Sequence, residues 1–498
     1  MDVVVGIAIF LVNNVLNQPA YLVGLVTAIG LLAMRRSIGN IASGAIKATM
    51  GFLILGVGAS TVVSALDPLG KIIFGATGAH GVVPTNEAVV ALAQKEFGAQ
   101  VAWVMIAGFA VSIILARFTP LKYVFLTGHH TFFMATMITV LLTTADMPTY
   151  QVVLVGALLV GTIMVVMPAF TQPWMRRVTG GEDMAMGHFG SVGYIVAGAV
   201  GGLVGKRSKS TEDMKFPEGL RFLRDSMVAT ALSMVLLYIA FALAFLARVG
   251  GDVAFKALDA SSIGEYLMAA VMQALLFGVG VAVILFGVRT ILGELVPAFN
   301  GIAAKVVPGA LPALDAPVVF PYGPNAVLIG FVASFVGGLA SLGVLVAFSS
   351  SLGLALILPG MVAHFFTGGT AGVFGNATGG RRGAVAGGFV NGVLITFLPA
   401  LLLQVLGSLG LANTTFGDAD FGWFGLAVGH SAELGPLGGL VVLVLLAVAL
   451  LVIAALFQRA VVSNGWDPGA RRDACLAAAK ENHDADRKSD ITGTPAAG

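Results

Sequence analysis

Charged residues are scarce in this sequence. Asp, Glu, Lys and Arg make up 10% of the 498 residues, whereas soluble proteins usually carry about 25%. A chain that is 57% hydrophobic cannot cover its surface with polar groups in water. The net charge of +2 is also too small to indicate a nucleic-acid partner. The composition therefore excludes an ordinary soluble protein and predicts a membrane protein.

Cysteine and the common catalytic motifs are equally scarce. A single cysteine, Cys475, excludes an intramolecular disulfide and lies among charged residues near the C-terminus. The sequence has no Gly-rich nucleotide-binding motif followed by Lys and Ser or Thr. It also has no cluster of Cys or carboxylate residues at the spacing of metal ligands. We therefore expect no bound cofactor and no metal ion.

Glycine, by contrast, is abundant at 66 residues and falls within long apolar runs, as close packing of membrane helices requires. Spanning a bilayer takes about 20 apolar residues per helix. The sequence predicts an all-α membrane protein with about eleven transmembrane helices. The predicted spans are residues 19–34, 44–64, 99–116, 122–142, 149–168, 225–247, 263–288, 325–349, 352–375, 384–408 and 436–457. We expect residues 3–16 to lie at the membrane interface and the Gly-rich residues 185–204 to form a re-entrant or buried segment.

Basic residues cluster in alternate loops, as they do on the cytoplasmic side of membrane proteins. The loop from Arg176 to Arg224 and the segment after Arg459 are rich in Lys and Arg, whereas residues 143–148 and 409–435 contain none. This alternation predicts an N-terminus outside and a C-terminus in the cytoplasm. The polar residues 459–498 are expected to form a disordered cytoplasmic tail.

The two halves of the chain contain similar short segments in the same order. Residues 84–90 (PTNEAVV) resemble residues 323–329 (GPNAVLI), and residues 126–133 resemble residues 358–366. Five spans per repeat is an odd number, so the second copy would be inverted, as in many transporters with broken helices. The predicted organisation is a first inverted repeat with its cytoplasmic loop, a second inverted repeat, a final transmembrane helix and the tail. These parts are residues 1–224, 225–434, 435–458 and 459–498.

Histidines within or beside apolar segments are the first candidates for a binding site. Ionisable residues are costly in a membrane and usually face a cavity. His129 and His130 follow Gly128 in one predicted span, and His188 follows Gly187 at the start of the Gly-rich segment. We expect His129 and His188 to contact a ligand and His130 to pack on a neighbouring helix. The alternative is that these histidines only donate to carbonyl groups of neighbouring helices or lie in a loop.

A second candidate group is formed by Thr85, Asn86 and Glu87, which follow Pro84 in a turn-like stretch. A half-helix that begins here would point its backbone N–H groups at a ligand. The alternative is an ordinary helix N-cap by Thr85 or Asn86.

The third candidate is Asp315, in the apolar, proline-broken residues 311–317. An unpaired carboxylate is costly to bury in such surroundings. Asp315 could accept hydrogen bonds from sugar hydroxyls, or act as the general base when a hydroxyl attacks a phosphoryl group. The alternative is a salt bridge, for instance with Arg289. Arg289 and Glu294 are expected to be structural, and His364 and Asn376 are not expected to contact a ligand.

These motifs resemble those of the ascorbate-type membrane subunit, enzyme IIC, of the bacterial phosphoenolpyruvate-dependent phosphotransferase system (PTS). The similarity runs from about residue 20 to about residue 460. The resembling segments are residues 126–129 (LTGH), 186–188 (MGH), 293–295 (GEL), 298–302 (AFNGI), 307–310 (VPGA) with Asp315, and 324–327 (PNAV).

The resemblance implies a homodimeric permease of the bacterial inner membrane, surrounded by lipid, with a dimerising part and a moving core. Such proteins import L-ascorbate, which a separate IIB subunit phosphorylates through a phosphocysteine. The substrate contacts of the family would fall on His129, His188 and Asp315. They would also fall near Gly58 and on residues 85–87.

The sequence departs from the ascorbate pattern at several of these positions. Phe133 and Phe189 stand where ascorbate members carry glutamine, and Asn86 and Glu87 stand where they carry Thr and Tyr. The two missing amides remove hydrogen bonds worth about 0.5–1.5 kcal/mol each. We expect Phe133 and Phe189 to stack on the ring face of a polyhydroxylated substrate instead.

Two other functions are compatible with the sequence. A proton- or ion-coupled carrier on the same scaffold would use Glu87 or Asp315 as its proton site. A membrane receptor or structural subunit would bind its ligand without moving it. Accumulation of a phosphorylated product would favour the PTS subunit over both.

Overall fold

The computed structural model describes residues 19–78, 80–181, 183–214, 226–407, 413–479 and 481. Within these residues, seven helices are long and apolar enough to cross a membrane. The chain is therefore an all-α, multi-pass membrane protein, as predicted. The expected interfacial segment, residues 3–16, lies outside the described residues.

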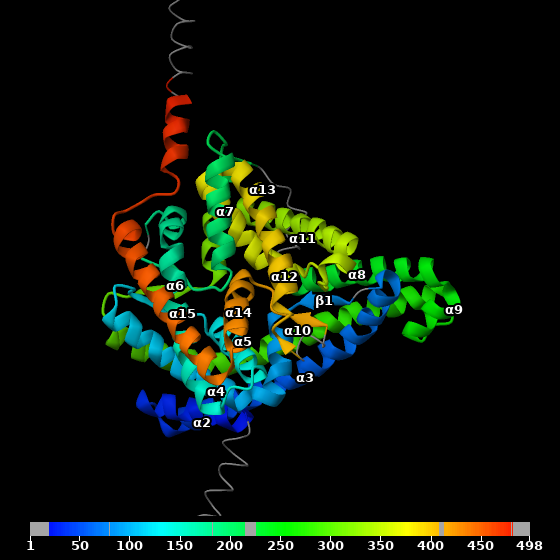
Figure 1. Cartoon of the computed structure of the whole chain (residues 1–498), viewed down its shortest axis with the longest axis horizontal. Helices are drawn as coiled ribbons and strands as arrows, with labels where there is room; N and C mark the ends of the chain where they lie inside the picture. The colour runs from blue at the N-terminus through cyan, green and yellow to red at the C-terminus, as the bar shows by residue number, and fades with distance from the viewer. Residues whose placement is uncertain are drawn as a thin grey trace, which may run out of the picture.

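Four helices form what we call the first bundle; in Figure 1, α2 and α3 lie at the lower side and α8 lies at the right. They are α2 (Pro19–Ala33), α3 (Ile38–Thr77), α8 (Ser226–Val249) and α10 (Ile263–Val306). The long helices α3 and α10 pack along each other, and α2 and α8 pack against them. Their backbones approach closely at Gly58, where an added Cβ would lie 2.8 Å from the carbonyl oxygen of Gly280. The short α9 (Gly251–Ala254) and η4 (Phe255–Leu258) link α8 to α10.

The other membrane helices form the second bundle. They are α4 (Asn86–Phe118), α5 (Gly128–Thr144), α6 (Thr149–Thr179), α7 (Ser191–Val204), α11 (Pro324–Leu352), α12 (Met361–Ala363), η6 (His364–Gly368), α13 (Gly369–Leu402), α14 (Ala419–Ala432) and α15 (Gly435–Phe457). Helices α7 and α11 pack on α13, and α4 packs on α6. A non-helical residue, Gly380, divides α13 into two parts.

In the Gly-rich residues 185–204, α7 has 14 residues, which is about 21 Å of helix and too short for a hydrocarbon core of about 30 Å. This length is compatible with the re-entrant or buried segment expected there. The predicted span 352–375 is instead a strand, the short α12, the π-helical η6 and the start of α13. Helix α14 was not predicted, because residues 409–435 were interpreted as a loop between spans.

Two small parallel sheets lie inside the second bundle. In the first, β1 (Gly81–Pro84) lies between β5 (Leu356–Ile357) and β6 (Thr414–Thr415). In the second, β4 (Leu311–Leu314) lies between β2 (Tyr123–Phe125) and β3 (Ala185–Met186). Each sheet therefore takes its middle strand from one half of the chain and its outer strands from the other. The pairing satisfies backbone groups that could find no water in an apolar interior.

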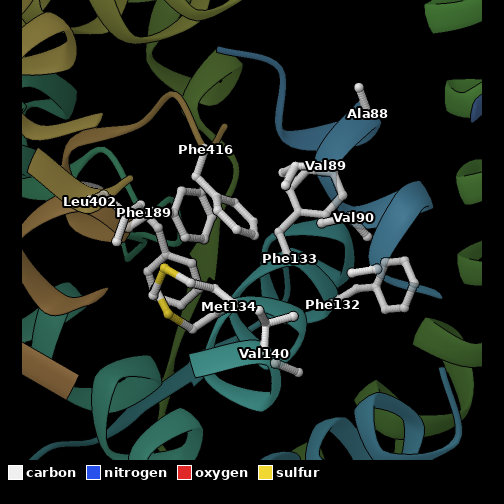
Figure 2. Packing of buried hydrophobic residues seen from close by; sticks show 14 of the residues in the cluster. Ala88, Val89, Val90, Phe132, Phe133, Met134, Val140, Phe189, Leu402 and Phe416 are labelled. Carbon is white, nitrogen blue, oxygen red and sulfur yellow. The ribbon is translucent and has the colours of Figure 1, made fainter. Parts of the chain in front are cut away.

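Buried aromatic side chains surround these sheets. Figure 2 shows Phe133, Phe189 and Phe416 packed together beside Met134 and the start of α4. Because the strands end within this core, the residues that follow them are held at the centre of the protein.

Part of the predicted disordered tail is folded. Residues 470–479 are helical, and Asp473 accepts two hydrogen bonds from the guanidinium of Arg177, both at 2.6 Å. Arg472 also donates to the carbonyl oxygen of Ser208 at 3.0 and 3.1 Å. Asp473 thus has a basic partner at the end of α6, and the fold of this segment shows that disorder does not extend over all of residues 459–498. Residues 480 and 482–498 lie outside the described residues.

Candidate functional site

A cavity of about 610 Å³ lies between the two bundles. The second bundle contributes its polar lining, and α10 contributes an apolar wall that includes Val281, Leu285 and Val288, with Arg289 beside them. The polar lining residues are Thr85, Asn86, Glu87, Thr127, His129, His130, His188, Asp315 and Asp418. A cavity of this size fits a small organic ligand.

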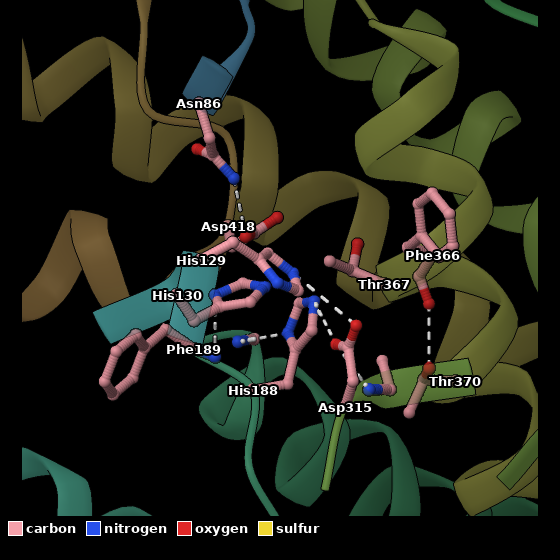
Figure 3. Close-up of polar contacts among 12 residues, drawn as sticks. Asn86, His129, His130, His188, Phe189, Asp315, Phe366, Thr367, Thr370 and Asp418 are labelled. Atoms are coloured by element: carbon pink, nitrogen blue, oxygen red, sulfur yellow. Dashed lines mark hydrogen bonds and ion pairs between the residues drawn. The ribbon is translucent and has the colours of Figure 1, made fainter. Parts of the chain in front are cut away.

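Four of these residues form what we call the histidine–aspartate cluster: His129, His130, His188 and Asp315. Nε2 of His129 lies 3.5 Å from Oδ2 of Asp315, and Nε2 of His188 lies 4.0 Å from Oδ1. The ring centroids of His130 and His188 are 3.8 Å apart, and those of His129 and His130 are 4.7 Å apart. Figure 3 shows the three rings converging on the Asp315 side of the site.

Backbone groups determine which ring nitrogen of His188 carries the proton. Its Nδ1 accepts a hydrogen bond from the N–H of Gly190 at 3.0 Å and lies 2.8 Å from the hydroxyl of Tyr194. Because Nδ1 is an acceptor, the neutral ring carries its proton on Nε2, the atom directed at Asp315. Nδ1 of His130 likewise accepts from the N–H of Phe189, at 3.4 Å. Both rings therefore offer N–H donors to the cavity.

The proton positions on His130 and His188 also indicate whether the site can bind a metal ion. Two groups, His129 with His130 and Asp315, and His130 with His188 and Asp418, have ligand atoms within 4.8 Å of one another. A neutral histidine that binds a metal through Nε2 carries its proton on Nδ1 and donates it. Here Nδ1 of both His130 and His188 accepts a backbone hydrogen bond. The residues fit a hydrogen-bonding organic ligand better than a metal ion.

Asp315 and residues 85–87 each follow a middle strand. Asp315 follows β4 and caps η5 (Ala316–Tyr322), because its Oδ1 accepts from the N–H of Ala316 at 2.8 Å. Thr85 follows β1 and is the N-cap residue of α4, but its side chain makes no capping hydrogen bond. Glu87 is buried in the first turn of α4 and lines the cavity. The carboxyl of Asp315 thus caps η5 through one oxygen and also faces the histidines.

Phe133 and Phe189 occupy different places. Phe133 lines the cavity, with its ring edge-on to His129 at a centroid distance of 5.7 Å. Phe189 is fully buried, stacks on Phe125 at 4.8 Å and is not among the cavity-lining residues. Gly58, at the crossing of α3 and α10, does not line the cavity either. In this conformation Phe189 and Gly58 support residues of the site without facing it.

His364 and Asn376 also lie away from the cavity lining. His364 is 2.8 Å from the hydroxyl of Ser334 in a buried polar group of α11 and α13. Asn376 accepts a hydrogen bond from the N–H of Thr211 at 3.0 Å. Both positions agree with the expectation that neither contacts a ligand.

Asp418 and Asp420 were not recognised in the sequence. Asp418 lines the cavity and accepts a hydrogen bond from Asn86, whereas Asp420 accepts from the backbone of Ser191 and Val192 at the start of α7. The signal was present, because both carboxyls stand beside apolar residues in a segment without Lys or Arg. Interpreting that segment as an external loop hid them.

The position of Arg289 also differs from the one expected from the sequence. It had been expected to be structural, yet it lines the cavity from α10. Glu294, in contrast, forms an ion pair with Lys47 of α3 at 2.8 Å. The two residues thus take separate roles on one helix.

The fold defines a multi-pass membrane protein, and a cavity large enough for a small molecule lies between its two helical bundles. The sequence model of one protein family, described as "PTS system sugar-specific permease component", matches residues 14–420. The chain therefore belongs to this family, and the predicted resemblance is confirmed.

A curated relative is the ascorbate-specific PTS system EIIC component of Mycoplasma pneumoniae (strain ATCC 29342 / M129 / Subtype 1). It is 27% identical over 410 residues, which cover 74% of this chain and 62% of the relative. The chain thus matches less than two thirds of the length of that relative.

Proposed function

We propose that this protein is the IIC permease of a PTS and carries a sugar-type, ascorbate-like substrate across the membrane for phosphorylation by a separate IIB subunit. The observation that carries the proposal is the histidine–aspartate cluster facing a cavity of about 610 Å³ in a chain of the sugar-specific permease family. The ascorbate-specific relative supports an ascorbate-like, polyhydroxylated substrate.

The two sides of the cavity match the two kinds of surface on a sugar. His130 and His188 offer N–H donors, and Asp315 offers acceptor oxygens, all from the second bundle. Helix α10 offers apolar side chains such as Leu285 and Val288. A ring with its hydroxyls toward the cluster and its C–H face toward α10 would satisfy both sides. Phe133 would then lie at the edge of the ring.

Transport would follow from motion of the second bundle against the first. Apart from Arg289 on α10, the hydrogen-bonding groups that line the cavity are on the second bundle, so a substrate held by the histidine–aspartate cluster would travel with that bundle past the apolar side chains of α10. The reciprocal sheets support two inverted repeats, residues 1–224 and 225–434, with residues 435–458 as a final helix. Strands β1, β2 and β3 begin at residues 81, 123 and 185, and β4, β5 and β6 begin at residues 311, 356 and 414. The near-constant offset is what a duplication would leave.

Asp315 would serve as the general base. When a substrate hydroxyl attacks the phosphoryl group on the IIB cysteine, an O–P bond forms, the S–P bond breaks and the hydroxyl proton must be accepted. Asp315 is the carboxyl nearest to His129 and His188, which would orient it and the hydroxyl. The phosphoryl donor belongs to the partner, so this chain supplies position and a proton acceptor.

The orientation and assembly complete the proposal. Eleven spans would place the N-terminus outside and the C-terminus in the cytoplasm of a bacterial inner membrane. Helix α3 exposes Ile46, Met50, Leu53 and Val57, which recur at helical spacing on one face. We assign this face to a homodimer contact, and the exposed apolar side chains of α15 to lipid.

The test is uptake into proteoliposomes that enclose phosphorylated IIB, with radiolabelled L-ascorbate outside. The proposal predicts that ascorbate phosphate accumulates inside and that omission of IIB stops the accumulation. Uptake that needs no IIB and collapses with the proton gradient would establish the ion-coupled carrier instead. Binding without any uptake would establish the receptor.

A further inference from the structure

Asp418 has an unusual place for a helix-capping residue. It precedes α14 as the N-cap residue, a position where an aspartate usually accepts a hydrogen bond from a free backbone N–H. Its side chain makes no such capping bond. Asp418 is 3% exposed and lines the cavity. The local backbone therefore does not explain why a carboxyl is buried here.

The neighbouring Asp420 shows what a structural carboxyl looks like in this protein. Its Oδ2 accepts from the N–H of Ser191 at 2.8 Å, and its Oδ1 accepts from the N–H of Val192 and from Nε1 of Trp423, both at 3.0 Å. Asp420 does not line the cavity. Both of its oxygens are used in joining α14 to the start of α7.

Among the described residues, the side chain of Asn86 holds the carboxyl of Asp418. Nδ2 of Asn86 donates to its Oδ2 at 2.8 Å, and Oδ1 of the same amide accepts from the N–H of Gly417, also at 2.8 Å. Asn86 thus fixes the direction of the carboxyl, as Figure 3 shows. In the part of the chain that the structure describes, the hydrogen bond from Asn86 goes to Oδ2 and not to Oδ1, and Asp418 lines the cavity.

His130 relates Asp418 to the rest of the site. A ring nitrogen of His130 lies within 4.8 Å of a carboxyl oxygen in both Asp315 and Asp418. Asp315 follows β4 in one sheet, whereas Asp418 follows β6 in the other. The two carboxyls therefore reach the cavity from different sheets, with the histidines between them.

We propose that Asp418 is a second substrate-contacting carboxyl, which binds a hydroxyl of the substrate at a different end from the hydroxyl bound by Asp315. This inference rests on the proposed function and extends its site by one specificity-determining residue. A polyhydroxylated ligand suits the arrangement, because hydroxyls donate to the carboxyls and accept from the histidine N–H groups between them. Asn86 is then a positioning residue for Asp418.

The experiment measures binding of L-ascorbate, and of analogues that each lack one hydroxyl, such as 5-deoxy- and 6-deoxy-L-ascorbate, to the purified full chain. Asp418→Asn should weaken ascorbate binding by about tenfold, the effect of losing one hydrogen bond to a buried group. The same substitution should leave the affinity for one analogue unchanged, because that analogue already lacks the hydroxyl. A purely structural role would weaken binding of every analogue by the same factor.

Asp67→Asn is the matched control, because Asp67 pairs with Lys71 on an exposed part of α3 and does not line the cavity. Its binding profile should equal that of the unsubstituted protein. Asp418→Glu keeps a carboxyl and serves if Asp418→Asn fails to fold; it should show the same loss confined to one hydroxyl.

The outcomes separate the inference from the proposed function. Equal losses on all analogues, or none, overturn the role of Asp418 while ascorbate binding upholds the proposed function. If the unsubstituted protein binds neither ascorbate nor any analogue, the proposed substrate class fails and the role of Asp418 fails with it.

Discussion

His188 and Asp315 meet because their preceding residues are paired across two strands. The N–H of Gly187 donates to the carbonyl oxygen of Leu314 at 2.6 Å, immediately before the two side chains. The approach is close: a Cβ on Gly187 would lie 2.3 Å from the carbonyl oxygen of Ala313. Residues distant in sequence are thus fixed within one site by the parallel register of β3 and β4.

The tautomer of His188 can be tested by two amide substitutions. The terminal nitrogen of glutamine reaches the place of Nε2, whereas the nitrogen of asparagine reaches only the place of Nδ1. His188→Gln should retain substrate binding to within about tenfold, and His188→Asn should lose more, because only glutamine keeps a donor toward Asp315. Isothermal titration of the two purified variants with ascorbate measures the difference. Equal affinities would show that the Nε2 donor is not used.

Asp315→Asn tests the carboxyl itself. Hydrogen bonds to a charged group contribute about 1.5–3 kcal/mol each, so the loss of binding should be about tenfold or more. The fold should survive, because asparagine can still accept from the N–H of Ala316 and cap η5. Size-exclusion profile and thermal midpoint provide the control. Ascorbate affinity equal to that of the unsubstituted protein would remove Asp315 from the site.

Phe133→Gln and Phe189→Gln form a matched pair for specificity. Both restore the glutamine of ascorbate-type members, but only Phe133 lines the cavity. Phe133→Gln should raise ascorbate affinity several-fold by adding an amide to the site. Phe189→Gln should instead lower the thermal midpoint, since it places an amide in a fully buried aromatic contact with Phe125. If Phe189→Gln alone raised affinity, the cavity seen here would not be the one that binds substrate.

The folded part of the tail predicts a small effect on stability and none on binding. Arg177 and Asp473 form a bidentate but partly exposed pair, so Asp473→Asn should cost at most about 1 kcal/mol. A thermal-unfolding midpoint that is slightly lower, with unchanged ascorbate affinity, is the expected result. An altered affinity would mean that the tail influences the site at a distance.

Much of the architecture was predictable from the sequence, because apolar runs flanked by basic loops specify membrane helices locally. The helices α2, α6 and α15 begin close to their predicted positions. The strands were not predictable, since two to four residues carry no periodic signal and pair only across the two halves of the chain.

The site residues also divide into those that the local sequence indicates and those that depend on contacts between distant segments. His129, His188 and Asp315 could be found because an ionisable residue beside apolar segments is costly in a membrane and usually faces a cavity. Asp418 also lies beside apolar residues, but its segment was interpreted as a loop because α14 is short. The contact of His130 with the backbone of Phe189 could not be predicted, because it depends on strand register rather than on composition.

The most direct test is a cryo-electron microscopy structure of the protein with bound L-ascorbate. The account predicts ligand density in the cavity between the bundles, with its hydroxyls within hydrogen-bonding distance of Asp315 and the neighbouring histidines and its ring face against α10. Ligand density elsewhere in the molecule, with that cavity free of ligand, would contradict it.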